Sequence, residues 1–144
     1  MNIKILQDLG LQAVTFDIGT VLIEEGKRNR NVFVLVSGKV MIKSGGHQIA
    51  IVEDAGTILG EISVLLATDP VATVVTTEPS EFFVIEDFMT FVRENSEACV
   101  SMAQILACRL INMNNQLVFV KDNLVELQGK LRDYVPVFPG NFQT

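Results

Sequence analysis

The segment Gly56–Leu66 holds the residues of this sequence best suited to binding an anion. Gly60 precedes a short apolar stretch that predicts a brief helix. A helix beginning there leaves the backbone amides of Glu61, Ile62 and Ser63 without helical partners, and such amides attract anions. Ser63 adds a hydroxyl donor, and the Glu61 carboxylate is suited to accept a hydrogen bond from a sugar hydroxyl. The segment therefore predicts a small anionic or nucleotide ligand, although such a turn of helix serves equally well as a structural corner.

His47 is the only histidine of the chain, and it follows Gly45-Gly46 in a predicted hairpin turn. A metal site or a general base would need partner ligands near it, and the surrounding β-rich region contains no second histidine and no cysteine. We therefore expect His47 to be an exposed turn residue and the chain to hold no metal. The sequence also lacks a nucleophile elbow, a Walker loop and a dinucleotide fingerprint, so we expect no enzymatic activity and no catalytic residue.

The two cysteines, Cys99 and Cys108, would point to nearly opposite faces of a single helix and cannot form a disulfide within it. This pattern favours a reducing compartment with buried thiols. The first residues, Met1–Asp8, are interrupted by polar side chains too early for a signal peptide. No apolar run approaches the roughly 18–20 residues that a bilayer-spanning helix needs. We expect a cytoplasmic protein that does not enter a membrane.

Short β-branched and aromatic runs separated by glycine turns fill the region from residue 12 to residue 86. These runs are Val21–Ile23, Val32–Val36, Val40–Ile42, Ile49–Val52, Val71–Val75 and Phe82–Ile85. Short strands with turns at this spacing predict a sandwich, barrel or jelly roll. Beyond residue 87, Phe88, Phe91 and Val92 fit one face of a helix, and Asn95-Ser96 is a predicted boundary that caps the next helix.

The clearest periodicity lies in the last third of the chain, where apolar residues alternate spacings of four and three. The series is Leu106, Leu110, Met113, Leu117, Val120, Leu124, Leu127 and Leu131. A heptad seam of this length predicts a coiled coil. One interpretation packs the seam onto the chain's own β domain. We favour a parallel homodimer, because so long a helix would extend past a small barrel and because the mean hydropathy of +0.37 is high.

The ordered glycines and the Gly60 segment resemble the cyclic nucleotide-binding domain family, over about Gly10 to Leu131. The matching stretches are Phe16–Leu22, Glu25-Gly26, Val32–Val40 and Ala55–Glu61, the last at the entry to the family's phosphate-binding cassette. The resemblance implies a β-roll of the jelly-roll type, followed by a short helix and a long helix. In the bacterial catabolite activator proteins that long helix dimerises.

The resemblance also implies roles for cassette residues. Gly60 and the amides of Glu61 and Ile62 would face a cyclic phosphate, Glu61 would accept the ribose 2′-hydroxyl, and Thr73 would lie near the base. The candidate ligand-binding residues are Gly60, Glu61, Ile62, Ser63, Pro70, Val71 and Thr73.

The sequence departs from the family at the residue that binds the phosphate. The family places an arginine within a Pro-Arg-Ala-Ala-Thr/Ser string, and an ungapped comparison sets Asp69–Thr73 there, with Pro70 in place of the arginine. Loss of a charge-assisted contact costs about 1.5–3 kcal/mol, and the Asp69 carboxylate adds repulsion. A basic side chain would have to come from elsewhere in the fold.

Composition limits the possible partners. The chain of 144 residues is 49% hydrophobic and carries 11 basic against 17 acidic residues, a net charge of −6. The basic residues are scattered apart from Lys27, Arg28 and Arg30, so we expect no nucleic-acid binding. We expect a β-roll domain over residues 1–94, a dimerisation helix over 95–132 and an irregular tail over 133–144. The residues after Leu131 are too few for a helix-turn-helix.

These observations favour a non-catalytic, homodimeric regulatory or sensor module, with nucleotide binding weakened or altered by the missing arginine. Ligand binding would shift a hinge at residues 93–96 and reorient the long helices. One alternative is a degenerate domain without ligand that docks a partner protein. Others are a cAMP or cGMP sensor using other residues, a truncated transcription regulator, and a small cupin-like enzyme, which a single histidine disfavours.

Overall fold

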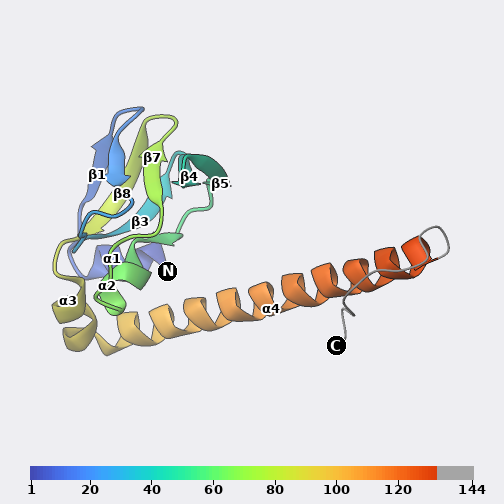
Figure 1. Ribbon diagram of the computed structural model, residues 1–144. Helices are drawn as coiled ribbons and strands as arrows, with labels where there is room; N and C mark the ends of the chain where they lie inside the picture. Colours follow the sequence, from blue (N-terminus) through green and yellow to red (C-terminus); the bar gives the residue numbers. More distant parts are fainter. Residues whose placement is uncertain (133–144) are drawn as a thin grey trace. The chain divides into compact units, whose positions relative to one another are not determined.

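The strands form two four-stranded antiparallel sheets that face each other (Figure 1). The computed structural model describes residues 1–132 of the chain. The first sheet has the order β1 (Ala13–Phe16), β8 (Ser80–Ile85), β3 (Val32–Ser37) and β6 (Ile58–Leu59). The second has the order β2 (Val21–Ile23), β7 (Thr73–Thr76), β4 (Val40–Ser44) and β5 (His47–Val52). This arrangement, followed by helices, confirms the predicted jelly-roll fold class.

The core between the sheets is built by alternate residues of the strands. Phe33 and Phe82 of the first sheet and Val40 and Val74 of the second belong to one buried apolar cluster. Phe82 packs edge-to-face with Phe33, their ring centroids 6.1 Å apart, and with Phe16 at 5.9 Å. Edge-to-face pairs add to the stability gained from burial. The sandwich therefore has a rigid aromatic centre.

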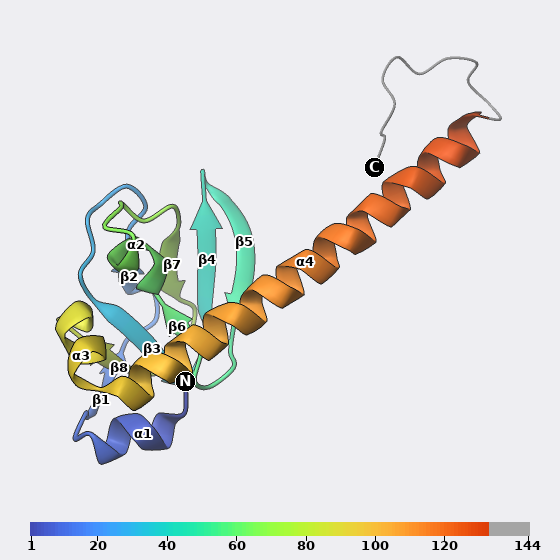
Figure 2. The same ribbon diagram turned by 90° about the horizontal axis from the view of Figure 1, so that it is seen from below.

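Strand β3 is buried on both faces, because all four consecutive residues from Val32 to Leu35 are at most 4% exposed. Alternate residues of a strand point to opposite faces, so a second layer must cover the face that turns away from the other sheet. Figures 1 and 2 show α1 (Ile3–Asp8), α3 (Phe88–Glu94) and the first turns of α4 (Ser96–Arg132) gathered on one side of this sheet. Their apolar residues Leu6, Phe88, Ala98 and Met102 are buried as well. The sequence pattern did not predict α1 or β1.

Helix α4 confirms the long helix that the heptad predicted and begins at the predicted Asn95-Ser96 boundary. The Asn95 side chain caps the preceding helix by donating to the Phe91 carbonyl at 2.8 Å. The chain divides into two compact units, residues 1–102 and a unit that begins at Ala103. The division into residues 1–94 and 95–132 stays a prediction. The tail predicted over residues 133–144 lies outside the described residues.

Two expectations need correction. The cysteines are exposed rather than buried, and Cys99 and Cys108 both lie on α4. Strand β7 begins at Thr73 and not at Val71, which is 79% exposed.

His47 is exposed and directly follows the glycine turn.

Membrane-spanning and metal-binding features were sought in the described part of the chain. Over residues 1–132, no helix combines the length and apolarity needed to cross a bilayer. Within the same residues, no group of three or more His, Cys, Asp or Glu side chains is placed to hold a metal ion.

Candidate functional site

Gly60 forms the sharp turn between β6 and helix α2 (Glu61–Leu65), the helix predicted from the sequence. Its φ of +90° lies in the left-handed region, where side chains are strained. A Cβ at this position would lie 2.8 Å from Cδ1 of Ile23 and 3.0 Å from the carbonyl oxygen of Asn31. Only glycine fits without displacing these neighbours, so Gly60 fixes where α2 begins.

Glu61 and Ser63 are the buried polar residues of α2. Glu61 is 3% exposed and stands in the first turn, where a carboxylate is favoured by the helix dipole. Ser63 is 7% exposed, and its hydroxyl donates to the carbonyl oxygen of Gly60 at 3.2 Å. The Ser63 proton is thus used inside the turn. Ile62, in contrast, exposes 56% of its surface.

The loop after α2 is tied to the segment that follows β2. The Gly26 amide donates to the Pro70 carbonyl oxygen at 2.9 Å, and the Glu25 amide donates to the Thr73 hydroxyl at 3.0 Å. Pro70 is buried, whereas the neighbouring Val71 is exposed and its carbonyl accepts from the Ser44 hydroxyl at 2.9 Å. Pro70 and Thr73 therefore hold the loop against the sheet through their oxygen atoms.

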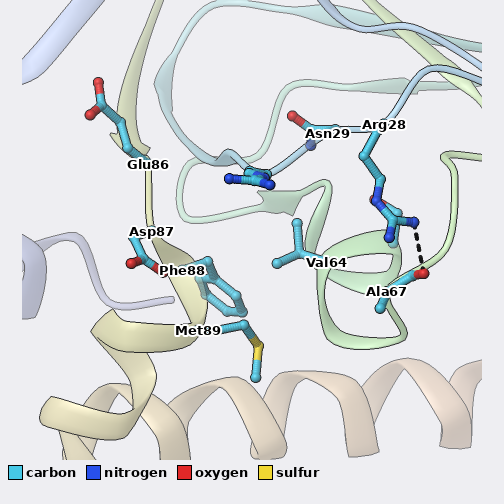
Figure 3. A pocket seen from close by; sticks show the side chains of 10 residues that line it. Arg28, Asn29, Val64, Ala67, Glu86, Asp87, Phe88 and Met89 are labelled. Atoms are coloured by element: carbon cyan, nitrogen blue, oxygen red, sulfur yellow. Dashed lines mark hydrogen bonds between the residues drawn. The ribbon is translucent and has the colours of Figure 1, made fainter.

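Arg28 brings a positive charge to this loop from the segment between β2 and β3. Its Nη1 donates to the carbonyl oxygen of Ala67 at 2.8 Å (Figure 3). The same atom lies 3.8 Å from Oδ1 of Asp69. The sequence indicated this residue only as part of a small basic cluster with Lys27 and Arg30. Its arrival beside α2 depends on the pairing of Gly26 with Pro70, which no local pattern reveals.

The predicted site residues thus lie along one continuous turn, helix and loop, Gly60–Thr73. The structure places Gly60, Glu61 and Ser63 at the start of α2, and Pro70, Val71 and Thr73 where the loop enters β7. The residues of this segment can form hydrogen bonds with a polar or anionic ligand. The part each of these residues takes in binding stays a prediction.

The predicted dimer seam lies on α4 and carries large exposed apolar side chains. Met113 and Leu117 are 66% and 67% exposed, and Leu110, Val120, Leu124 and Leu127 are also exposed. Leu106 and Leu131 are half-buried. An exposed apolar stripe of this length is unfavourable in water unless a partner covers it.

Comparison with known proteins relates the fold to one family. A family model for the cyclic nucleotide-binding domain matches residues 13–95, more than half of the chain. The structure of a catabolite activator protein from Thermus thermophilus matches with a TM-score of 0.67 and 23% identity, covering 83% of this chain and 60% of that one. This chain therefore spans less than two thirds of the length of the Thermus protein.

Two further structures are similar. A transcriptional regulator from Thermotoga maritima has a TM-score of 0.66 and 16% identity, with 83% of this chain and 98% of that chain covered. A cAMP-binding acyltransferase from Mycobacterium smegmatis is 31% identical over 61% of this chain and 29% of that one, with a TM-score of 0.51. The curated proteins contain no match.

The matched range includes every strand of both sheets together with α2 and α3, whereas α1 lies before it. The chain belongs to the cyclic nucleotide-binding domain family.

Proposed function

We propose that this chain is a non-catalytic, homodimeric regulatory module whose cassette binds cAMP and cGMP weakly or binds a different small anion. The observation that carries the proposal is the state of Pro70. By resemblance to the family, this position belongs to the arginine that binds the cyclic phosphate. A proline has no N–H, and this one is buried with its carbonyl oxygen engaged by Gly26. It offers an anion neither a charge nor a donor.

Arg28 supports the choice of altered binding over complete loss. A guanidinium has five N–H donors, and Arg28 uses Nη1 on the Ala67 carbonyl oxygen. Its charge thus stands near the carboxyl end of α2 rather than at the Pro70 position. The exposed carboxylate of Asp69, 3.8 Å away, offsets part of that charge. A ligand that uses Arg28 would have to lie differently from a cyclic nucleotide held by the family's arginine.

The long helix supports the homodimeric part of the proposal. Its exposed seam has the heptad spacing of two-stranded coiled coils. The break between α3 and α4 at Asn95 supplies a hinge, over residues 93–96, through which a change in the cassette would alter the geometry of the two helices. Allosteric coupling needs such an element with two arrangements.

The proposal is tested by thermal unfolding of the full chain with and without millimolar cAMP and cGMP. A ligand at one hundred times its dissociation constant stabilises the folded state by about 2.7 kcal/mol, so binding at this level is readily seen. The same measurement is made on Pro70→Arg, which restores the guanidinium. Pro70→Ala is the matched control, because it removes the ring without adding a charge.

We expect little or no shift for the unmodified chain and for Pro70→Ala, and a shift of several degrees for Pro70→Arg. A shift of several degrees in the unmodified chain would show a working cyclic nucleotide sensor and contradict the proposal. If no variant shifts, the cassette does not bind cAMP or cGMP even with the guanidinium restored, and this result favours a domain that serves as a dimerisation or docking piece for a partner protein.

A further inference from the structure

A cavity lies between α2, the segment of residues 28–30 and the start of α3. We propose that this cavity binds a small monocarboxylate with an apolar or aromatic group, and that this binding does not require the family's cassette pocket. The cavity has a volume of about 370 Å³. Ligand pockets in proteins range over roughly 300–1,000 Å³, so it suits a compact metabolite.

One wall of the cavity is basic and locally ordered. The Asn29 side chain donates to the Asn31 carbonyl oxygen at 2.6 Å and accepts from the Asn31 amide at 3.1 Å. This Asx turn fixes the backbone between Arg28 and Arg30, both of which line the cavity. Arg28 is partly engaged by Ala67, whereas Arg30, which makes no hydrogen bond or close ion pair within residues 1–132, acts through its charge on the Asp87 carboxylate. Two guanidiniums with free donors match the planar fork of a carboxylate.

The floor of the cavity is apolar. Val64 of α2, Phe88 and Met89 line it, and Figure 3 shows them between the arginine side and the acidic side. Phe88 is 1% exposed, so the apolar surface open to a ligand comes mainly from the half-buried Val64 and Met89. A ligand that reaches the arginines across this floor gains from an apolar or aromatic body.

The opposite wall carries the acidic residues Glu86 and Asp87, and their negative charges limit how much negative charge a ligand can carry. Figure 3 shows both carboxylates directed away from Val64. Asp87 accepts from the amide of Thr90 at 3.2 Å and from its hydroxyl at 2.9 Å, so it is held by its own helix. The two acidic and two basic side chains of the lining balance each other. A monoanion therefore fits better than a doubly charged phosphate, whose second charge would meet the field of the carboxylates.

An occupant would bridge α2, which carries the cassette, and α3, which leads to the hinge at residues 93–96. Whether the site then regulates the cassette rests on the proposed function. Binding in the cavity itself does not, because of the cassette residues singled out from the sequence only Ser63 contributes to its lining.

The test is a titration of the 144-residue chain with sodium benzoate, followed by amide chemical shifts in ¹⁵N-labelled protein. Acetate has the carboxylate but no aromatic ring, and benzyl alcohol has the ring but no negative charge. Arg30→Gln removes the unpaired guanidinium, and Val64→Phe fills the cavity while leaving both arginines. Arg132→Gln is the matched control, because it removes the same charge at a position remote in sequence. Melting curves establish that each variant is folded.

We expect saturable benzoate binding in the millimolar range, with shifts centred on residues 28–30, 63–67 and 86–89. Acetate and benzyl alcohol should each bind at least several-fold more weakly. Arg30→Gln should raise the dissociation constant about tenfold to a hundredfold, and folded Val64→Phe should abolish binding, whereas Arg132→Gln should leave it unchanged. The proposal is overturned by the absence of saturable shifts, by equal binding of benzyl alcohol, or by unchanged affinity in Arg30→Gln. None of these outcomes bears on the cyclic nucleotide result with Pro70→Arg.

Discussion

A methyl group added to Gly60 would lie 3.0 Å from the carbonyl oxygen of Asn31, so the start of α2 and the chain before β3 meet without room for a side chain. We predict that Gly60→Ala lowers the free energy of unfolding by about 2–4 kcal/mol, the sum of left-handed strain and overpacking. Thermal unfolding should show a Tm lower by roughly 5–15 °C.

Gly46 offers a matched control for this substitution. Its φ of +78° is similar, but a Cβ there would meet nothing within 4 Å. Gly46→Ala should therefore cost only about 1–2 kcal/mol, the conformational part alone. Equal losses in the two variants would show that the contact with Asn31 is unimportant and that only the backbone conformation matters.

The seam of α4 gives a prediction about assembly. We expect Leu117→Lys to raise the dissociation constant of the homodimer on the order of a thousandfold, because each of two apolar contacts is lost and a charge is placed in the seam. Leu117 is 67% exposed in the single chain, so the substitution should leave the β-sandwich folded. Sedimentation velocity over a range of concentrations measures the effect.

Asn115→Lys serves as the control, because it adds the same charge on the helix face opposite the seam. It should sediment as the unmodified protein does. A Leu117→Lys variant that remains as dimeric as Asn115→Lys would rule out α4 as the dimer interface. The homodimer would then have to form through another surface or not form at all.

The start of the cassette was predictable because glycine and glutamate have position-specific roles there. Gly60 stands where the chain adopts a positive φ, and Glu61 follows at the first position of a helix. These two requirements concern adjacent residues, so they can be recognised in the sequence without knowledge of the fold. Most of the strands around them were predictable for a similar reason, since β-branched and aromatic runs separated by glycine turns are short-range patterns.

Arg28 and α1 were not predictable from local patterns. Arg28 reaches the cassette loop because Gly26 pairs with Pro70, a contact between residues far apart in sequence. Helix α1 has only six residues, and a helix of that length gains little from propensity; burial of Leu6 stabilises it.

The N-terminal cap of α3 predicts a defined dependence of stability on pH. Hydrogen bonds from the Thr90 hydroxyl and amide hold the pKa of Asp87 below its usual value. A carboxyl whose pKa is lower in the folded state stabilises the protein above its unfolded pKa, and this contribution is lost as the pH falls through the folded pKa.

We predict that Asp87→Asn, which can still cap the helix but does not titrate, is less stable than the unmodified protein at neutral pH. The difference should be constant down to about pH 4 and should vanish below the lowered pKa of Asp87. Urea unfolding at a series of pH values measures it, and a difference that grows on acidification would show that the Thr90 contacts do not favour the charged form.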